Sequence, residues 1–441
     1  MGQYFGTDGI RGVANKEVTC EIAYKTGIAL RGLLQGKAPR VLIACDTRVS
    51  GGMLLFSLAA GCSAAGIAVD VMGIAPTPAA AHLTVACGYD AGIVISASHN
   101  KMEYNGIKLF KADGQKLADA EEAFIEQVLA STVVSALVTG SKVGKITSRP
   151  DLLTVYCNAL KARYPYSGKR HRILIDTANG AAYITAKYLF PKADFLFDKP
   201  DGCNINDGCG STDMAALSNA VTSGHYALGI AFDGDADRCL MVDAKGRLIS
   251  GDKIGGALAA YRKRQGKLNG NALVCTIVSG TGLLEFAKEQ DIAVIKTAVG
   301  DKFVIEEMLR QNLSIGFENA GHIVLNEGVP IGDGQAAALY FLSILEEEKI
   351  TAEQLTADIK EYPQVQRAIL VSDEGRKCFL ESPALFTLAA ELEKRYNVRS
   401  ILRLSGTEPV VRIVTEGAKE TAAIAAADAL EAAVKAACQS N

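Results

Sequence analysis

The sequence predicts an α/β protein with three similar mixed α/β domains and a smaller C-terminal α+β domain. The chain has 441 residues, too many for one hydrophobic core, because domains usually hold about 100–150 residues. Apolar strands alternate with helical stretches, as they do in βαβ units, and this favours parallel sheets covered by helices. Strands that end in polar loops begin near residues 41, 172 and 271, which indicates a divergent repeat.

The composition excludes several functional classes. Hydrophobic residues make up 49% of the chain and charged residues 22%, as in ordinary soluble proteins. The net charge of −3 offers no basic field, so we expect neither nucleic acid nor membrane as a partner. We find no apolar signal segment and no stretch long enough to span a bilayer. The 11 cysteines form no CxxC pair, which favours free thiols in a reducing cytoplasm over a zinc site.

Residues 1–150 form the first predicted domain. The N-terminal run YFGTDGIRG combines glycines with Asp8 and Arg11, which favours a loop. The elements expected after it are a helix near 21–35, a strand at 41–46, a helix at 53–66, strands at 68–73 and 93–95, and a helix at 120–130. The segment 131–150 is only weakly patterned, and we expect a linker there.

Three further domains are expected at residues 151–250, 251–362 and 363–441. Domain 2 opens with the strand RILID and domain 3 with the strand NALVCTIV. After Pro363 the pattern changes to a strand at 365–372, a helix at 382–396, strands at 400–405 and 410–416, and a helix at 419–437. Ser382 and Pro383 suit the cap and the first position of the first of these helices. A small antiparallel sheet with two helices fits an α+β domain.

The stretch Gly92–Phe110 has the strongest pattern of a reacting site. Its β-branched run Ile93–Ile95 predicts a buried strand, which is followed by Ser98 and His99. A rigid strand that carries a hydroxyl and an imidazole to a loop can hold a reacting group in place. Taken alone, a strand followed by a polar turn is the simpler interpretation. An esterase elbow is excluded because positions 96 and 100 are not glycines.

Three carboxylates, Asp233, Asp235 and Asp237, alternate with small residues directly after the strand LGIAF. Such a cluster can converge on one Mg²⁺, with water or a phosphate oxygen completing the coordination shell. An EF-hand is excluded because Arg238 and Ala244 stand where that loop requires glycine and glutamate. A solvated acidic turn is less favoured, since three neighbouring carboxylates repel one another without a counter-ion.

Two other polar clusters each follow an apolar run. The loop RLSGTEP at 403–409, with Arg412 beyond it, offers backbone donors, hydroxyls and arginines that suit a phosphate dianion. The loop ENAGH at 318–322 could hold sugar hydroxyls, although a structured turn explains it equally well. A hydroxyl nucleophile, a magnesium site, a phosphate loop and a sugar loop together predict phosphoryl transfer on a phosphorylated sugar.

The order of these motifs resembles the α-D-phosphohexomutase superfamily, most closely its bacterial phosphoglucosamine mutase branch. The motifs that stand where this family has them are YFGTDGIRG, DTRVSG, ISASHN with NGIK, DTANGA, NINDGCGSTD, FDGDADR, VGDKF, ENAGH, GDG and RLSGTEP. The resemblance implies four domains around a central cleft. It also implies a cytoplasmic isomerase of amino sugar metabolism that makes a cell-wall precursor, interconverting glucosamine 6-phosphate and 1-phosphate through an enzyme phosphoserine and a sugar bisphosphate.

The resemblance assigns roles to individual residues. The phosphoserine would be Ser98, and Mg²⁺ would be bound by Ser98, Asp233, Asp235 and Asp237. The transferring group would be surrounded by Arg11 and Lys108, with Lys108 and His322 as candidate proton carriers. The non-reacting phosphate would be bound by Arg403, Ser405, Gly406, Thr407 and Arg412, and the sugar by Arg238, Lys302, Glu318 and Asn319.

Three departures from the family put the sugar in question more than the reaction type. Lys101 replaces a proline, the sugar loop has Phe317 and Ala320 in place of a glycine and a serine, and Ile331 replaces the threonine before Gly-Asp-Gly. A glucose or mannose phosphomutase with the same mechanism and a non-catalytic phosphosugar-binding paralogue stay open as alternatives. A Mg²⁺-dependent phosphatase is a further alternative, although a closed cleft would exclude the water that it needs. The sequence leaves the oligomeric state open, with a homodimer among the options.

Overall fold

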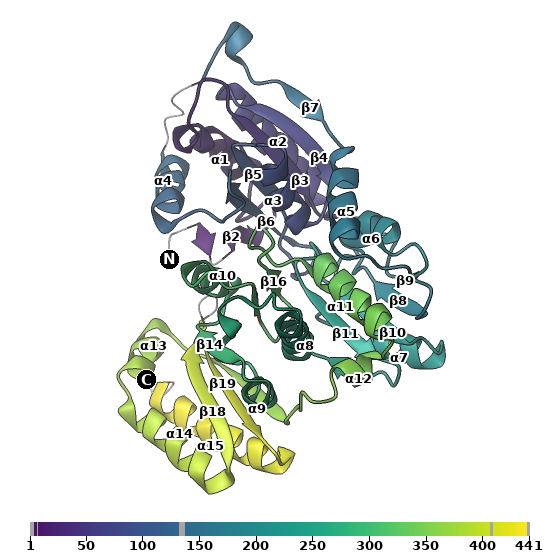
Figure 1. The fold of residues 1–441 in the computed structure, drawn as a ribbon. Coiled ribbons are helices and arrows are strands. Elements are labelled where there is room, and N and C mark those ends of the chain that lie inside the picture. Colours follow the sequence, from purple (N-terminus) through teal and green to yellow (C-terminus); the bar gives the residue numbers. More distant parts are fainter. Residues whose placement is uncertain (1–3, 7, 132–136, 406–408, 439–441) are drawn as a thin grey trace.

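The computed structural model describes residues 4–6, 8–131, 137–405 and 409–438. The described residues form four sheets, each with its own helices (Figure 1). The purple N-terminal sheet lies at the top of Figure 1, the yellow C-terminal sheet at the bottom, and the other two lie between them. The predicted fold class of three mixed α/β domains and a smaller α+β domain is confirmed.

Domain 1 has a seven-stranded sheet in the order β1-β2-β6-β5-β3-β4-β7. Three of its pairings, β3–β4, β3–β5 and β4–β7, are parallel and the others antiparallel, so the sheet is mixed rather than mostly parallel. The elements are β1 (Phe5–Gly6), β2 (Gly9–Val13), α1 (Cys20–Leu33), β3 (Arg40–Cys45), α2 (Ser50–Ala64), β4 (Ala68–Ile74), α3 (Thr77–Ala86), β5 (Ala91–Ile95), β6 (Tyr104–Lys111), α4 (Asp119–Ala130) and β7 (Ile146–Ser148).

Two expectations for domain 1 were wrong. Arg11 lies in strand β2, paired with Gly106 of β6, rather than in a loop. The glycines of this run favour a loop locally, but the antiparallel pairing to β6 satisfies their backbone groups. The expected linker contributes strand β7, which extends the sheet at β4. Its three residues are too few to give an alternating pattern.

Domains 2 and 3 continue the alternation of strands and helices. Their sheets have the orders β12-β11-β10-β8-β9 and β14-β13-β15-β16. Domain 2 holds α5 (Leu152–Arg163), β8 (Ile173–Asp176), α6 (Ala182–Leu189), β9 (Asp194–Leu196), α7 (Ala215–Ser223), β10 (Leu228–Phe232), β11 (Cys239–Asp243) and β12 (Leu248–Ile249). Domain 3 holds α8 (Gly251–Arg264), β13 (Ala272–Thr276), α9 (Thr281–Glu289), β14 (Ala293–Thr297), α10 (Asp301–Arg310), β15 (Ile315–Phe317), β16 (Ile323–Leu325), α11 (Gly334–Glu348) and α12 (Ala352–Leu355).

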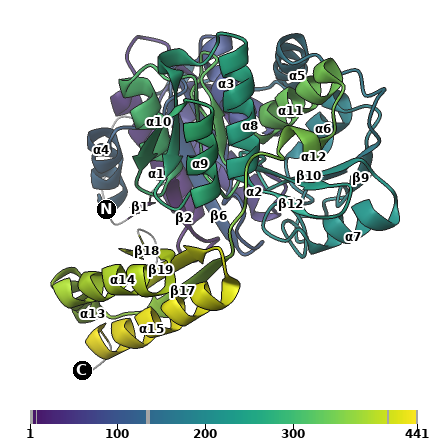
Figure 2. The same ribbon diagram turned by 60° about the horizontal axis from the view of Figure 1, so that its bottom comes forward.

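Domain 4 has an antiparallel sheet in the order β17-β19-β18. Figure 2 shows helices α14 and α15 on the face of this sheet that points away from the other domains. Pro383 takes the predicted first helical position, but the Ser382 side chain makes no capping hydrogen bond. The elements are β17 (Gln364–Leu370), the unpredicted helix α13 (Asp373–Leu380), α14 (Pro383–Tyr396), β18 (Val398–Leu404), β19 (Val410–Gly417) and α15 (Glu420–Cys438).

The buried apolar side chains of the described residues form five clusters, of which the largest is shared by three domains. Side chains of domains 1, 2 and 3 form one continuous cluster, which runs from Leu42 to Ile359. The domain 4 cluster, which includes Ile413 and Leu430, stands by itself. Domain 4 is therefore the part whose packing depends least on the others.

Among the helices that the structure describes, none combines the length and apolar character needed to cross a lipid bilayer.

Candidate active site

Ser98 follows β5, a strand whose five residues are all buried. Its backbone is in the left-handed region, with φ of 51°, and its N–H donates to Ser96 Oγ at 2.9 Å. The Ser98 hydroxyl donates to Asp233 Oδ2 at 2.6 Å and lies 3.3 Å from His99 Nδ1. Burial, aided by the nearby charges of Arg238 and Arg11, lowers the pKa of His99 to about 3. The hydroxyl therefore lies between a carboxylate and a neutral imidazole.

Two residues that the sequence reasoning did not place in the site hold the loop of Ser98. The buried Arg48 guanidinium donates to the carbonyl oxygens of Ser98 at 2.9 Å, Asn100 at 2.8 Å and also Lys101. Asn206 Nδ2 donates to the Ser98 and Asn100 carbonyls at 2.9 and 3.1 Å. The motifs DTRVSG and NINDGCGSTD contain these residues, so the signal was present in the sequence. Because both side chains bind backbone carbonyl groups, which every residue has, the sequence does not reveal which residues they contact.

The three aspartates lie on the loop after β10, and all of them are buried. One carboxylate oxygen from each lies within 4.8 Å of the others. Gly234 allows this loop to approach Ser98, since a Cβ there would lie 2.6 Å from the Ser98 carbonyl oxygen. Asp235 Oδ1 and Asp237 Oδ1 are buried without a hydrogen-bond partner among the described residues. Oxygen ligands that are buried, convergent and unsatisfied fit a hard divalent cation such as Mg²⁺.

The charges around these carboxylates are unevenly distributed. Burial, and after it the charges of Asp237 and Asp235, raise the pKa of Asp233 well above its ordinary value. Burial would also raise the pKa of Asp237, but the charges of Lys108, His322 and Arg238 together outweigh this effect, and the pKa is lowered. Lys108 Nζ lies 2.8 Å from Asp235 Oδ2 and 3.1 Å from Asp237 Oδ2. One lysine therefore compensates part of the negative charge where a metal ion would bind.

Lys108 also connects this cluster to the N-terminal strands. Its ammonium lies 2.8 Å from Asp8 Oδ2, and Arg11 Nη2 lies 2.9 Å from the same oxygen. Burial would lower the pKa of Lys108, but Asp235, Asp8 and Asp237 raise it well above its ordinary value. Lys108 is therefore an ammonium at neutral pH. The structure places both predicted cations, Arg11 and Lys108, on one carboxylate beside the metal loop.

His322 of domain 3 meets the loop of the three aspartates at Arg238, the residue that follows Asp237. The two residues form an antiparallel bridge, and the Arg238 N–H donates to Asp233 Oδ1 at 3.1 Å. A Cβ at Gly332 would overlap His322 Nε2, and a Cβ at Gly334 would overlap the Arg238 carbonyl. The glycines of the Gly-Asp-Gly motif therefore leave the space that His322 and Arg238 occupy. His322 Nε2 is buried and has no hydrogen-bond partner in the part of the chain that the structure describes.

The rest of the predicted sugar loop lies next to His322. Glu318 accepts a hydrogen bond from the Gly300 N–H at 3.0 Å, and the Asn319 carbonyl accepts one from the Gly251 N–H at 3.0 Å. Ala320 is exposed. Glu318 therefore has a carboxylate oxygen to spare for a ligand, whereas Ala320 presents only a methyl group.

The predicted phosphate loop begins at the end of β18. Arg403 and Arg412 are cross-strand partners in β18 and β19. Burial, and after it the charge of Arg412, lower the pKa of Arg403, and Arg403 Nε is buried with no hydrogen-bond partner among the described residues. Ser405 is buried beside them, whereas Gly406 and Thr407 lie outside the described residues. Two adjacent guanidinium groups repel each other unless an anion lies between them, which suits a phosphate.

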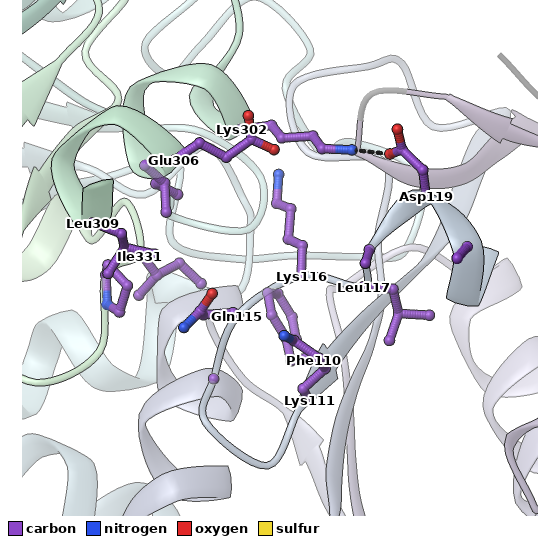
Figure 3. A pocket seen from close by; sticks show the side chains of 15 residues that line it. Phe110, Lys111, Gln115, Lys116, Leu117, Asp119, Lys302, Glu306, Leu309 and Ile331 are labelled. Carbon is purple, nitrogen blue, oxygen red and sulfur yellow. Dashed lines mark hydrogen bonds and ion pairs between the residues drawn. The ribbon is translucent and has the colours of Figure 1, made fainter. Parts of the chain in front are cut away.

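Lys302 has a partner in domain 1. Its ammonium pairs with Asp119 at the start of α4 (Figure 3). The two residues line a cavity of about 480 Å³ between domains 1 and 3. The described residues that line this cavity come from 110–120, 302–309 and 330–331, not from the loops of Ser98, the three aspartates or His322. A contact between Lys302 and the sugar therefore stays a prediction.

Comparison with known proteins gives matches along the chain. Models of the phosphoglucomutase/phosphomannomutase family match as alpha/beta/alpha domain I at residues 2–133, domain II at 154–246, domain III at 250–362 and the C-terminal domain at 352–434. The phosphoglucosamine mutase of Clostridium kluyveri is 40% identical over 430 residues, which cover 95% of this chain and 96% of that protein. That of Clostridium beijerinckii is 42% identical over 426 residues, 95% of each.

Solved structures show the same fold. A phosphoglucomutase/phosphomannomutase family protein from Burkholderia thailandensis has a TM-score of 0.81 at 21% identity, covering 98% of this chain and 97% of that one. The N-acetylphosphoglucosamine mutase of Aspergillus fumigatus, solved in complex with GlcNAc-6P and magnesium, has a TM-score of 0.70 at 17% identity, covering 99% and 96%. Because the family models match four successive parts of the chain and relatives of at least 40% identity span 95% of it, the chain belongs to the phosphoglucomutase/phosphomannomutase family.

Proposed function

We propose that this protein is a phosphoglucosamine mutase, an isomerase that interconverts glucosamine 6-phosphate and glucosamine 1-phosphate. The observation that carries the proposal is the contact of 2.6 Å between Ser98 Oγ and Asp233 Oδ2. It places a buried hydroxyl of domain 1 against three convergent carboxylates of domain 2. The Clostridium relatives bear this enzyme name, which supports the choice of glucosamine.

In the proposed reaction, Ser98 is the residue that carries and accepts the phosphoryl group. The bond between Ser98 Oγ and phosphorus breaks while phosphorus bonds to a sugar hydroxyl oxygen, which gives a sugar bisphosphate. The reverse step, with the sugar turned end for end, returns its other phosphate to Ser98. The proton of the sugar hydroxyl passes to His322 Nε2, which is buried without a hydrogen-bond partner among the described residues. Lys108 supplies positive charge, because its three carboxylate neighbours keep it protonated.

The remaining residues bind and orient the substrate. Mg²⁺ held by Asp233, Asp235, Asp237 and the Ser98 phosphate would neutralise the phosphoryl oxygens and make the Ser98 oxygen a better leaving group. Arg11 lies next to Lys108 and Asp8, where it can pair with the transferring group. Glu318, Asn319, Arg238 and Lys302 form the proposed sugar side, and Arg403, Ser405, Gly406, Thr407 and Arg412 the proposed phosphate side. A single phosphate pocket can serve both orientations of the sugar.

The test is a coupled mutase assay with Mg²⁺ and a trace of sugar bisphosphate. It compares kcat/KM for glucosamine, glucose and mannose 6-phosphates, and glucosamine 6-phosphate should be preferred by about tenfold or more, which is about 1.4 kcal/mol.

Ser98→Ala should lower kcat by at least about 10³-fold, because the nucleophile is lost. The control Ser63→Ala removes only a hydrogen bond to the Gly144 carbonyl and should stay active. A Ser98→Ala variant with substantial turnover would contradict the phosphoserine mechanism.

A second candidate substrate is a neutral hexose phosphate. Ala320 favours it, because its methyl group cannot make the hydrogen bond to a sugar hydroxyl that the family's serine makes, a contact of about 0.5–1.5 kcal/mol. A higher kcat/KM for glucose or mannose 6-phosphate in the same assay would select this alternative. In either case the proposal places the enzyme in the cytoplasm, where its buried free thiols, such as Cys45 and Cys275, stay reduced.

A further inference from the structure

A chain of alternating charges crosses from domain 1 to domain 3 beside the candidate active site. Lys116 Nζ lies 2.6 Å from Asp8 Oδ1 and also pairs with Asp301 Oδ2. The other oxygen of Asp8 lies 2.8 Å from Lys108 Nζ. Asp301 Oδ2 lies 3.8 Å from His322 Nε2. Lys116 is therefore one carboxylate away from each of the two candidate proton carriers, Lys108 on domain 1 and His322 on domain 3.

Lys116 has the environment of a fixed group rather than of a mobile surface lysine. Its side chain is 19% exposed, and those of Asp8 and Asp301 are 20% and 13% exposed. Burial would lower the pKa of Lys116, but Asp301 and Asp8 outweigh this and raise it. Burial would likewise raise the pKa of Asp8, but Lys108, Lys116 and Arg11 hold it well below its ordinary value. The three side chains are in contact, and each limits where the next can lie.

A second ion pair at the same seam has a different character. Figure 3 shows Lys116 pointing from its loop towards the helix of Lys302 and Glu306, while Lys302 reaches Asp119. The Asp119 side chain is 86% exposed, so solvent screens that pair. The seam therefore has an exposed pair at its rim and a half-buried charge chain next to the candidate active site. Of the two, the half-buried chain has contacts that continue to Lys108 and His322.

We propose that Lys116 is a positioning residue, which fixes Lys108 and His322 relative to each other by holding Asp8 of domain 1 and Asp301 of domain 3 at the same ammonium. Lys108 faces the carboxylates that hold the reacting centre, and His322 is the proposed proton acceptor. Their spacing decides whether the reacting atoms are aligned, and a misplacement of about 1 Å can lower a rate about 10²-fold. This kinetic part of the inference rests on the proposed mutase function.

Lys116→Met keeps most of the side-chain length and removes the charge. We expect kcat to fall about 10- to 100-fold with KM changed less than about threefold, because the substrate contacts stay while the alignment is lost. Lys116→Arg can still pair with the carboxylates of Asp8 and Asp301. Its log kcat should therefore lie at least halfway between those of Lys116→Met and the wild type. The matched control is Lys111→Met in the same segment, since Lys111 pairs with Asp113 of its own turn. It should keep wild-type kcat.

Hydrogen exchange gives a second readout that needs no activity. In Lys116→Met, amides at residues 300–310 of domain 3 should exchange faster than in the wild type, although the substitution is in domain 1. Lys111→Met should leave them unchanged. Unaltered exchange at 300–310, or a kcat within about threefold of wild type in folded Lys116→Met, overturns the inference. If Lys116→Met does not fold, Asp301→Asn, which cannot pair as a carboxylate, must give both effects. If the wild type is inactive on every phosphosugar, the proposed function is rejected. The inference on Lys116 is then still decided by hydrogen exchange, which measures its coupling to residues 300–310 without any activity.

Discussion

Ser98 adopts a backbone conformation that costs a residue with a side chain about 1–2 kcal/mol. Such a conformation persists when the surroundings determine it fully. Here Arg48 and Asn206 hold the carbonyl of Ser98 itself, and Ser96 holds its N–H. Ser98 is thus held by its backbone groups in addition to the contact of its hydroxyl with Asp233. Arg48 and lysine are not interchangeable at such a clamp, because one guanidinium reaches three carbonyl groups here.

The sugar loop offers a prediction at the scale of one residue. Ala320→Ser adds a hydroxyl at an exposed position between Asn319 and Gly321, where it can donate to a sugar hydroxyl. One such bond contributes about 0.5–1.5 kcal/mol, so kcat/KM should change about two- to tenfold for a sugar that can make it. The coupled assay with glucosamine and glucose 6-phosphates measures this change. Equal kcat/KM values in Ala320→Ser and wild type for both sugars would show that position 320 does not contact the substrate.

Several buried carboxylates lie at a strand end or a helix start, among them Asp176, Asp252 and Asp333. Asp252, the second residue of α8, accepts a hydrogen bond from the Gly280 N–H at 2.7 Å, where β13 leads into α9. Burial raises the pKa of Asp252 to about 6, although that hydrogen bond opposes the shift. A carboxyl with a raised folded pKa stabilises the fold fully below its unfolded pKa of about 3.9. It loses this contribution as the pH rises through about 6.

The corresponding prediction concerns Asp252→Asn, which stays neutral at every pH. Relative to wild type, the variant should gain up to about 3 kcal/mol of stability between about pH 4 and about pH 7.5, because only the wild type ionises there. Thermal unfolding of both proteins across this range measures the difference. Asp358→Asn, at an exposed position, is the control and should show no such trend. A pH-independent difference for Asp252→Asn would mean that the buried carboxyl does not titrate near pH 6.

The elements were predicted where the sequence pattern is local. Strand β5 and the loop of Asp233 to Asp237 are continuous in sequence, so hydrophobic pattern and residue type suffice to find them. Strand β2 was not predicted, because its glycines indicate a loop and only the pairing with β6 makes this segment a strand. The contact between Lys116 and Asp301 joins residues 185 apart in sequence, and only the packing of two domains brings them together. The boundaries at 150, 250 and 362 stay predictions.

At the scale of the whole molecule, domain 4 is attached to domain 3 through a buried carboxylate. Glu416 of β19 accepts hydrogen bonds from the Thr281 N–H at 3.0 Å and from its hydroxyl at 2.7 Å, at the start of α9. Arg399, 3.5 Å from Glu416, donates to the carbonyls of Ser279 and Ile277. The turn at 279–282 therefore does more than connect β13 to α9, because it also binds domain 4.

Glu416→Ala should loosen this attachment. Hydrogen bonds to a charged group contribute about 1.5–3 kcal/mol, and the proposed phosphate loop depends on domain 4 for its position. We expect KM for the phosphosugar to rise about tenfold with a smaller change in kcat, measured in the coupled assay. The control is Glu420→Ala, at an exposed position in α15. A Glu416→Ala variant with wild-type KM would show that these contacts do not set the position of the phosphate loop.

The separate core of domain 4 affects the order in which parts of the molecule unfold. Cooperative units follow contiguous buried apolar contacts. Among the described residues, the largest cluster joins domains 1 to 3, and the domain 4 cluster includes no residue of those domains. Ser98 and the three aspartates lie in the first three domains, whereas Arg403 and Arg412 lie in domain 4. Local melting of domain 4 would therefore remove the proposed phosphate loop while the loop of Ser98 stays folded, so loss of activity on heating would precede loss of most of the structure.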